Sequence, residues 1–379
     1  MADPTNKRPI VCLEFFSGIG GLHYGLQQSG IAGKVAMSFD MNENANDVYE
    51  HNFFGQRPNN KAIDYLDLHD IDRHKANCWL LSPPCQPYTR GGKYLDDQDP
   101  RARGLIHLLR LLPRLAHIPD YLLLENVMNF ENSRSRTILV TTLGHLGFAV
   151  QEFLLSPVQF GIPNNRLRYF LVARREWPRP SSAEAGNEQG EQAWIAANKQ
   201  RTDEYLQRGR DAMHTQWPVD QATDVELAPL ASYIDIKAND DPSLFVPEAY
   251  ILKRKNLEFD IVRASSELTS TFTKAYGSKH LIGSGSLLQT KRLDVVESGF
   301  KSPERLLDLG LRFFSPKEVA LLHHFPYAEA GEEDLHGTRT IPKYTLRFPS
   351  SITQRQRLQL LGNSLNVQVV AELLRRAFG

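Results

Sequence analysis

The sequence predicts an α/β fold: an open, Rossmann-like sheet with helices on both faces, plus a second, smaller domain. Three observations support this prediction. Short apolar runs recur between helical patterns, at Ile10–Phe16, Val35–Phe39, Cys78–Leu81 and Tyr121–Leu124. A glycine turn joins the first of these runs to a helical pattern, and an amphipathic C-terminal helix follows a less regular middle region. Strands that alternate with helices are typical of sheets covered on both faces.

The size and charge of the chain set limits on its partners. The 379 residues, 41% of them hydrophobic, allow one large domain and a smaller one. Lysine plus arginine and aspartate plus glutamate both number 44, so no overall basic field indicates nucleic-acid binding. Such binding would depend on local clusters, for example Arg166, Arg168, Arg174 and Arg175.

The cysteine count and the polar N-terminus also narrow the possibilities. Cys12, Cys78 and Cys85 make an odd number without zinc-type spacing, so we expect neither a disulfide framework nor a metal site. No apolar run approaches the length of a membrane span, and the first residues lack the apolar region of a signal peptide. We therefore expect an intracellular protein, in the cytoplasm, the nucleus or both, that binds no membrane.

The first strand and its turn suggest a cofactor site. Ile10–Phe16 is followed by the glycine turn Ser17-Gly18-Ile19-Gly20-Gly21 and then by a helical pattern with Leu22 and Leu26. Glycines let the backbone approach a ligand while the N-terminus of the helix faces it, and nucleotide-type cofactors bind in this way. The turn is not Gly-x-Gly-x-x-Gly, so by itself it is weak evidence.

Acidic residues follow the next strands. The second strand ends at Asp40, about 20 residues past the glycines, where a carboxylate can accept hydrogen bonds from two ribose hydroxyls. Asp40 fits a helix N-cap equally well. In the next acidic loop, Ile63 is suited to stacking on an adenine ring and Asp64 to its amino group, although both residue types are ordinary at a strand end.

The third strand ends in a stiff loop that carries a thiol. Cys78–Leu81 is stopped by Pro83 and Pro84, which cannot donate to a sheet and which restrict the residue before them. The loop holds Cys85 at the end of a strand, where open α/β sheets bind ligands. From these residues alone two interpretations remain: a small buried side chain, which is the commoner one, or a reactive thiol.

The fourth strand ends in a carboxylate. Tyr121–Leu124 leads directly into Glu125-Asn126-Val127, so Glu125 is either a cap for the next helix or a desolvated functional acid. Two further strand-like runs, 149–155 and 167–173, follow. Arg166 and Arg168 are two residues apart, which on a strand would direct both to one face, and such a pair suits phosphate or base oxygens.

The pattern of the chain changes twice. We expect residues 1–174 to form the first part of the main domain, 175–224 a linker or flexible insertion, 225–308 the second domain, and 309–379 a return to the main domain. The return is predicted from two helices, Pro316 to His324 and a helix after Gly362-Asn363-Ser364 in which Val367, Val370, Ala371 and Leu374 share a face.

Five motifs, in this order, resemble the motif set of the cytosine carbon-5 methyltransferases. The motifs are Phe16-Ser17-Gly18-Ile19-Gly20-Gly21, Pro83-Pro84-Cys85-Gln86-Pro87, Glu125-Asn126-Val127, Asn165-Arg166-Leu167-Arg168 and Gly362-Asn363-Ser364. The likeness covers most of residues 10–175 and 310–379. It implies a Rossmann-like S-adenosylmethionine-dependent methyltransferase sheet with a smaller target recognition domain, and it favours the reactive-thiol interpretation of Cys85.

Within that family the chain is most similar to the tRNA-aspartate cytosine-5 methyltransferases, the type two DNA methyltransferase group. Segments such as Ser82 to Thr89, Glu152 to Pro157 and Gly161 to Ala173 carry this likeness. Thr271 stands where the group usually has cysteine. The resemblance implies a tRNA (cytosine-5-)-methyltransferase that acts on cytosine 38 in the anticodon loop of tRNA-Asp. A DNA (cytosine-5-)-methyltransferase and an inactive nucleic-acid-binding relative are the alternatives.

The resemblance also implies roles for individual residues. Cys85 would add to carbon 6 of cytosine, Glu125 would bind ring nitrogen 3, Arg168 would hold the carbonyl oxygen, and Arg166 would brace the loop or a phosphate. The cofactor would be S-adenosylmethionine, with S-adenosylhomocysteine as product. Its expected binding residues are Phe16, Gly18, Ile19, Gly20, Gly21, Asp40, Ile63, Asp64, Ser82, Asn363 and Ser364. We expect a monomer whose partner is tRNA, with DNA as the alternative partner.

Overall fold

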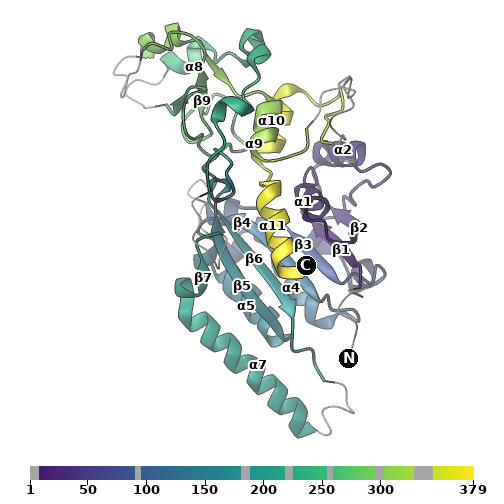
Figure 1. The fold of residues 1–379 in the computed structure, drawn as a ribbon. Coiled ribbons are helices and arrows are strands. Elements are labelled where there is room, and N and C mark those ends of the chain that lie inside the picture. Colours follow the sequence, from purple (N-terminus) through teal and green to yellow (C-terminus); the bar gives the residue numbers. More distant parts are fainter. Residues whose placement is uncertain are drawn as a thin grey trace.

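The computed structural model describes residues 8–89, 95–180, 188–217, 225–253, 259–295, 303–327 and 345–379. Its main sheet has seven strands in the order β2-β1-β3-β4-β6-β5-β7 (Figure 1). The strands are β1 (Ile10–Phe15), β2 (Gly33–Phe39), β3 (Cys78–Leu81), β4 (Tyr121–Val127), β5 (Phe148–Leu155), β6 (Arg168–Arg175) and β7 (Met213–His214).

The order of the strands creates a ligand-binding edge. Strands β2, β1, β3 and β4 are parallel, whereas β6 is antiparallel to both of its neighbours. The chain passes from β2 on one side of β1 to β3 on the other, and open α/β sheets bind ligands at the carboxyl end of such a switch point. Phe15 is level with Phe39 and with Leu81, so β1, β2 and β3 end together.

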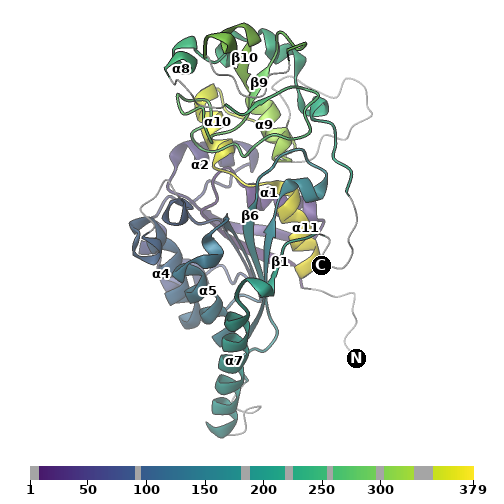
Figure 2. The ribbon, with the colours of Figure 1, turned by 90° about the vertical axis from the view of Figure 1, so that its left-hand side faces the viewer.

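Helices cover both faces of the sheet, which confirms the predicted fold class. Figure 2 shows α4 (Arg103–Leu111) and α5 (Arg134–His145) on one side, and α11 (Val367–Phe378) on the other. Helix α1 (Gly21–Ser29) packs on the same face as α11. Alternate residues of β1, β3 and β4 belong to two apolar clusters, one under each set of helices. This alternation follows from the two-residue period of a strand.

A smaller part lies beyond the carboxyl edge of the sheet (Figure 1). It holds a three-stranded sheet in the order β10-β9-β8. The strands are β8 (Ile261–Val262), β9 (Leu287–Gln289) and β10 (Leu311–Phe313), and the helices around the two parts are α2 (Glu43–Asn52), α3 (Leu68–Asp72), α8 (Glu248–Leu252), α9 (Pro316–Leu322) and α10 (Gln354–Gly362). Strand β10 lies beyond residue 308, and the core of this part also includes Tyr24, Tyr49 and Phe53. The expected boundary at 308 therefore runs through one continuous core.

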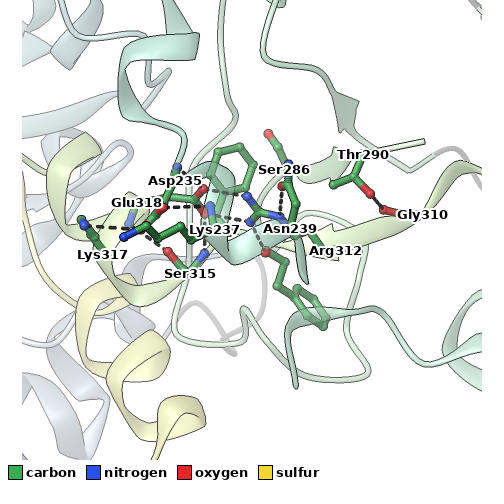
Figure 3. Close-up of polar contacts among 12 residues, drawn as sticks. Asp235, Lys237, Asn239, Ser286, Thr290, Gly310, Arg312, Ser315, Lys317 and Glu318 are labelled. Atoms are coloured by element: carbon green, nitrogen blue, oxygen red, sulfur yellow. Dashed lines mark hydrogen bonds and ion pairs between the residues drawn. The ribbon is translucent and has the colours of Figure 1, made fainter. Parts of the chain in front are cut away.

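A buried ion pair fastens the small sheet to α9. Arg312 on β10 and Glu318 on α9 are both fully buried, and two hydrogen bonds of 2.7 and 2.8 Å join them (Figure 3). Glu318 also accepts from the backbone of Asp235 and Ser315, and Arg312 donates to Asn239. A buried charge pair is tolerated when its remaining hydrogen-bonding groups are satisfied, as they are here. The cluster holds the start of the small part against α9.

The region 175–224 differs from the expected linker. The described part contains α7 (Glu188–Arg208), a helix of 21 residues, and β7, which extends the main sheet beside β5. Residues 181–187 and 218–224 lie outside the described residues. The helix buries only Asn198 and Thr202, and Arg201 lies 4.4 Å from the ring centre of Trp177. Near its end, Tyr205 and Leu206 also pack, partly buried, against the apolar core under α4 and α5. Since its two fully buried side chains are polar, the helix shows no long apolar period in the sequence.

Candidate active site

The loop that carries Cys85 is held by the neighbouring strands. The Ser82 amide donates to the Phe15 carbonyl at 3.2 Å, and the Asn126 side chain donates to the Pro83 carbonyl at 3.1 Å. Cys85 itself is partly buried, at the start of a short 3₁₀ turn over Gln86–Tyr88. The thiol therefore has a fixed position at the carboxyl edge of the sheet.

Glu125 is a desolvated acid and not a helix cap. Strand β4 continues to Val127 because the antiparallel strand β6 pairs with it to that point, so Glu125 lies within the strand. Its residue exposure is 7%. The Ser82 hydroxyl donates to Oε2 at 2.9 Å, and Arg168 Nε lies 3.7 Å from Oε1. Burial raises the pKa of Glu125, while the nearby Arg168 cation lowers it in part.

Arg166 and Arg168 do not share a strand face, so that prediction is wrong. Strand β6 begins at Arg168, and Arg166 lies before it. The Arg166 side chain is 3% exposed and donates from Nη1 to the Phe272 carbonyl at 2.7 Å and from Nη2 to the Ser364 carbonyl. Burial lowers its pKa to about 9. These contacts fit the bracing role, whereas only Arg168 is paired with Glu125.

The charges around Cys85 shift its pKa in both directions. Burial raises the pKa of the Cys85 thiol, and Glu125 raises it further. The Arg168 and Arg166 guanidinium groups lower the same pKa because a nearby cation favours the thiolate. Cys85, Glu125, Arg166 and Arg168 thus influence one another's ionisation.

The glycine turn leaves room for a ligand. Gly18 has φ +52°, and a Cβ placed on it would meet no atom within 4 Å. Gly20 has φ +85°, and a Cβ there would lie 2.4 Å from the Phe53 ring. Ser17 Oγ is buried and has no hydrogen-bond partner among the described residues. An open space beside an unpartnered hydroxyl is consistent with a bound ligand at this turn.

Asp40 supports the same turn. Its Oδ2 accepts from the Gly18 amide at 2.8 Å, and its Oδ1 accepts from the Asn42 amide at 2.8 Å. The N-cap of α2 is Asn42, so the N-cap interpretation of Asp40 is wrong. Burial raises the pKa of Asp40, although the backbone hydrogen bonds oppose this effect.

The remaining expected cofactor residues lie around the turn. Phe16 and Ile63 are neighbours, because both lie within 3.4 Å of the Cβ position of Gly104. Asp64 follows Ile63 in a 3₁₀ turn over Ile63–Tyr65. Ser364 Oγ lies 3.2 Å from the Cβ position of Gly21. The apolar side chains of Phe16 and Ile63, the carboxylates and the open backbone have the chemical character that a ligand such as S-adenosylmethionine requires.

Asn363 and Ser364 follow a close contact between the end of α10 and the small part. Asn363 is the C-cap of α10, directly after Gly362. A Cβ on Gly362 would lie 2.1 Å from the Thr273 carbonyl, so only glycine lets this helix end approach the loop 271–277. The C-terminal motif and the loop of the small part are therefore packed together.

The sequence analysis did not single out Arg101, and it gave no partner for Thr271. Arg101, whose side chain is 47% exposed, forms two hydrogen bonds of 2.9 and 2.7 Å with the carboxylate of Asp99; Asp99 raises the pKa of Arg101, and Cys85 adds a smaller effect in the same direction. The helix-start pattern Asp99-Pro100-Arg101 was the available signal. Thr271 donates its hydroxyl hydrogen to the Asn165 carbonyl at 2.8 Å, so threonine at this position joins the small part to the arginine loop.

Within the described ranges, the structure has neither a metal site nor a membrane-spanning helix. No group of three or more histidine, cysteine, aspartate or glutamate side chains there is placed to bind a metal ion. Each described helix is too short or too polar to cross a lipid bilayer.

The chain is similar to known proteins over almost its whole length. The C-5 cytosine-specific DNA methylase family matches residues 10–378. A Bos taurus tRNA (cytosine(38)-C(5))-methyltransferase is 37% identical over 406 residues, which cover 97% of this chain and 98% of that protein. A Dictyostelium discoideum DNA (cytosine-5)-methyltransferase is 37% identical over 385 residues, 96% of this chain and 93% of that protein.

A solved structure is also similar to this chain over almost its whole length. The crystal structure of a Spodoptera frugiperda DNMT2 mutant has a TM-score of 0.72 and 34% identity, and it covers 98% of this chain and 100% of that chain. The family's printed name refers to DNA and the bovine relative's name to tRNA, so membership alone leaves the nucleic acid open. From the assembled motifs and the match over residues 10–378, the chain belongs to the C-5 cytosine-specific DNA methylase family, whose members are S-adenosylmethionine-dependent methyltransferases.

Proposed function

We propose that this chain methylates carbon 5 of cytosine 38 in the anticodon loop of tRNA-Asp, through a covalent adduct of Cys85. One observation carries the proposal: Cys85, Glu125 and Arg168 lie together at the sheet edge that also holds the glycine turn. The choice of tRNA is supported by relatives named for cytosine 38 of tRNA, at 37% identity over 97% of this chain.

The cofactor residues divide by the part of the ligand that they would hold. S-adenosylmethionine supplies the methyl group when it is bound. The backbone of Gly18 to Gly21 and the Asp40 carboxylate would hold the ribose side, with Ile63 and Asp64 at the adenine. Phe16 would pack near the sulfonium, since an aromatic face attracts a cation. Ser82, Asn363 and Ser364 would lie at the methionine end.

The chemistry starts with the thiol because carbon 5 of cytosine is a poor nucleophile. The Cys85 thiolate donates an electron pair to carbon 6 and forms an S–C bond, which moves ring electrons toward carbon 5 and nitrogen 3. Glu125, whose burial favours the protonated form, gives a proton or hydrogen bond to nitrogen 3. Arg168 holds the carbonyl oxygen of the base. After carbon 5 takes the methyl group, loss of its proton and cleavage of the S–C bond restore Cys85.

The small part would recognise the target. We assign this role to 225–308 together with β10, because its loop at Thr271 and Phe272 is bonded to Asn165 and Arg166 beside the site. The base must be unstacked before it can reach Cys85, and a single-stranded anticodon loop makes this cheaper than in duplex DNA. We expect a monomer that acts in the cytoplasm, the nucleus or both.

A second candidate is DNA cytosine methylation, because the Dictyostelium relative of equal identity is named for DNA. Labelled S-adenosylmethionine, offered with tRNA-Asp, with the same tRNA lacking cytosine 38, and with duplex DNA, separates the two. We expect label only on intact tRNA-Asp, and none with Cys85→Ala. Label on DNA alone would favour the second candidate, and label on neither substrate would favour an inactive relative.

A further inference from the structure

A cavity of about 170 Å³ lies between α5, the start of β5 and α7, and the proposed chemistry does not use it. Helix α7 extends past the end of the sheet (Figure 1), and one face of it lines the cavity with Asn198, Arg201, Thr202 and Tyr205. The opposite wall, from α5 and β5, is apolar and includes Val140, Phe148, Ala149 and Val150. The cavity therefore has one polar and one apolar side.

Close contacts fix the shape of the cavity. A Cβ on Gly144 of α5 would lie 2.0 Å from Thr202 Oγ1, so α5 and α7 touch at this glycine. The Trp177 amide donates to the Gly147 carbonyl at 2.9 Å, and Trp194 Nε1 donates to the Trp177 carbonyl at 3.1 Å. Trp177, which also lines the cavity, is thus held on both sides. Small-molecule sites are usually formed in this way before the ligand binds.

Arg201 provides a positive charge at this cavity. Its guanidinium carbon lies 4.4 Å from the ring centre of Trp177, and the group also donates to Asn198 Oδ1. Among the described residues no acidic side chain forms an ion pair with Arg201, whereas the neighbouring Lys199 is paired with Asp203 at 3.0 Å. A cation that is held in place without a carboxylate favours an anionic ligand.

Asn198 adds a buried donor beside the cation. The residue is 2% exposed, and its Nδ2 has no hydrogen-bond partner within the described part of the chain. Arginine only donates, so the atom that faces Arg201 is the amide oxygen and the unpartnered atom is the nitrogen. A buried donor without an acceptor costs free energy. An oxygen bound at the contact of Asn198 with Arg201 would lie next to this donor.

The size and the charge of the cavity indicate the class of ligand. A cavity of about 150 Å³ with apolar walls accepts benzene, so a single six-membered aromatic ring fits here. One unpaired cation suits one negative charge better than the nearly two charges of a phosphate monoester. We propose that this cavity binds a small aromatic monocarboxylate, with the ring against the apolar wall and the carboxylate accepting from Arg201 and Asn198. This inference does not depend on the proposed function.

Three ligands test the proposal in calorimetric titrations of the full chain. Benzoate has both the ring and the charge, benzamide keeps the ring without the charge, and acetate keeps the charge without the ring. We expect benzoate to bind about tenfold or more tightly than either of the others, because each of them lacks either the charged hydrogen bonds or the apolar contact.

Two variants test the position of the ligand. Arg201→Gln keeps a donor for Asn198 but removes the charge, so benzoate should bind about tenfold or more weakly. Asn198→Asp keeps an acceptor for Arg201 and supplies an internal carboxylate that neutralises the cation, so it should weaken benzoate to a similar extent. Lys199→Gln is the matched control, because Lys199 is an exposed cation on the same helix that does not line the cavity. Its affinity for benzoate should equal that of the unchanged chain.

A lack of benzoate binding to the unchanged chain, or equal affinities for benzoate, benzamide and acetate, would overturn the proposal. This comparison uses no variant, so it stands even if a substitution prevents folding. An unaltered benzoate affinity in an Arg201→Gln variant with the circular dichroism of the unchanged chain would also overturn it, because the ligand would then bind elsewhere.

Discussion

The Arg166 guanidinium donates to the backbone carbonyl of Phe272 at 2.7 Å, across 106 residues of sequence. The same side chain donates to the Ser364 carbonyl. One buried cation thus joins the entry of β6, the loop of the small part and the C-terminal motif. The two arginines of the motif Asn165-Arg166-Leu167-Arg168 consequently have different roles, since Arg168 faces Glu125.

Arg166→Lys should affect the free energy of unfolding more strongly than the rate of methyl transfer. A lysine ammonium cannot reproduce the planar fork of arginine, so at least one charged hydrogen bond is lost, at a cost of about 2 kcal/mol. Chemical denaturation measures the free energy of unfolding. Arg168→Lys is the matched control: its stability loss should be smaller, while its rate of methyl transfer should fall further. Equal stability losses would contradict the division of roles.

Glu125→Gln should change the pH profile of methyl transfer as well as its rate. The reaction needs Glu125 protonated and Cys85 ionised, and burial raises both pKa values. Above the pKa of Glu125, the rising fraction of Cys85 thiolate is offset by the falling fraction of protonated Glu125, so the rate of the unchanged chain does not change with pH. Above the pKa of Cys85 the rate falls, because Cys85 is then fully ionised while Glu125 continues to lose its proton.

The amide cannot lose its proton, so in Glu125→Gln the rate should keep rising with pH until Cys85 is fully ionised. At neutral pH the variant should be slower by about 10²–10⁴-fold. Measuring kcat/KM of the unchanged chain and of Glu125→Gln between pH 6 and 10 tests this prediction. A variant that keeps the alkaline fall would show that another group is the acid.

Asp40→Ala should weaken the binding of S-adenosylmethionine by about tenfold or more, because hydrogen bonds to the Gly18 amide and to the ribose would both be lost. Isothermal calorimetry gives the dissociation constant. Glu43→Ala on α2, an exposed carboxylate paired with Arg57, is the control and should bind as the unchanged chain does. Unchanged affinity in Asp40→Ala would remove Asp40 from the cofactor site.

Arg101→Ala should weaken tRNA binding without changing the affinity for the cofactor. Arg101 is half-exposed, and its pKa is raised mainly by the Asp99 carboxylate and to a lesser extent by Cys85, so its cation is within electrostatic range of the thiol; we expect it to contact a phosphate of the unstacked nucleotide. Loss of one phosphate contact should reduce the slope of log affinity against log salt by about 0.7 to 0.9. Arg57→Ala is the control, since three carboxylates already surround that arginine. Equal salt slopes for Arg101→Ala and the unchanged chain would contradict the contact.

Much of the site could be predicted because its residues directly follow buried strands. Cys85, Asp40 and the glycine turn stand after apolar runs whose ends meet at one sheet edge. The partners of Arg166 could not be predicted, because they lie 106 and 198 residues away. The length of β4 was also hidden, since its end is set by pairing with β6.

The fold was less predictable where the buried side chains are polar. The two fully buried side chains of helix α7 are Asn198 and Thr202, and its apolar contacts, Tyr205 and Leu206, lie together near its end, so it has no long apolar period to detect. Glu14 was missed for a related reason: a single glutamate inside an apolar strand gives no sign, in the sequence, of the tyrosine and the helix start that surround it.

The proposed function depends above all on covalent attack of Cys85 on cytosine 38 of tRNA-Asp. The most direct measurement uses tRNA-Asp with 5-fluorocytosine at position 38 and S-adenosylmethionine, because fluorine cannot leave as the carbon-5 proton does and the adduct persists. We predict a complex that survives denaturation, with the RNA and one added methyl group attached to the peptide containing Cys85, and no complex with Cys85→Ala. No adduct on the unchanged chain, or an adduct on another residue, would contradict the account.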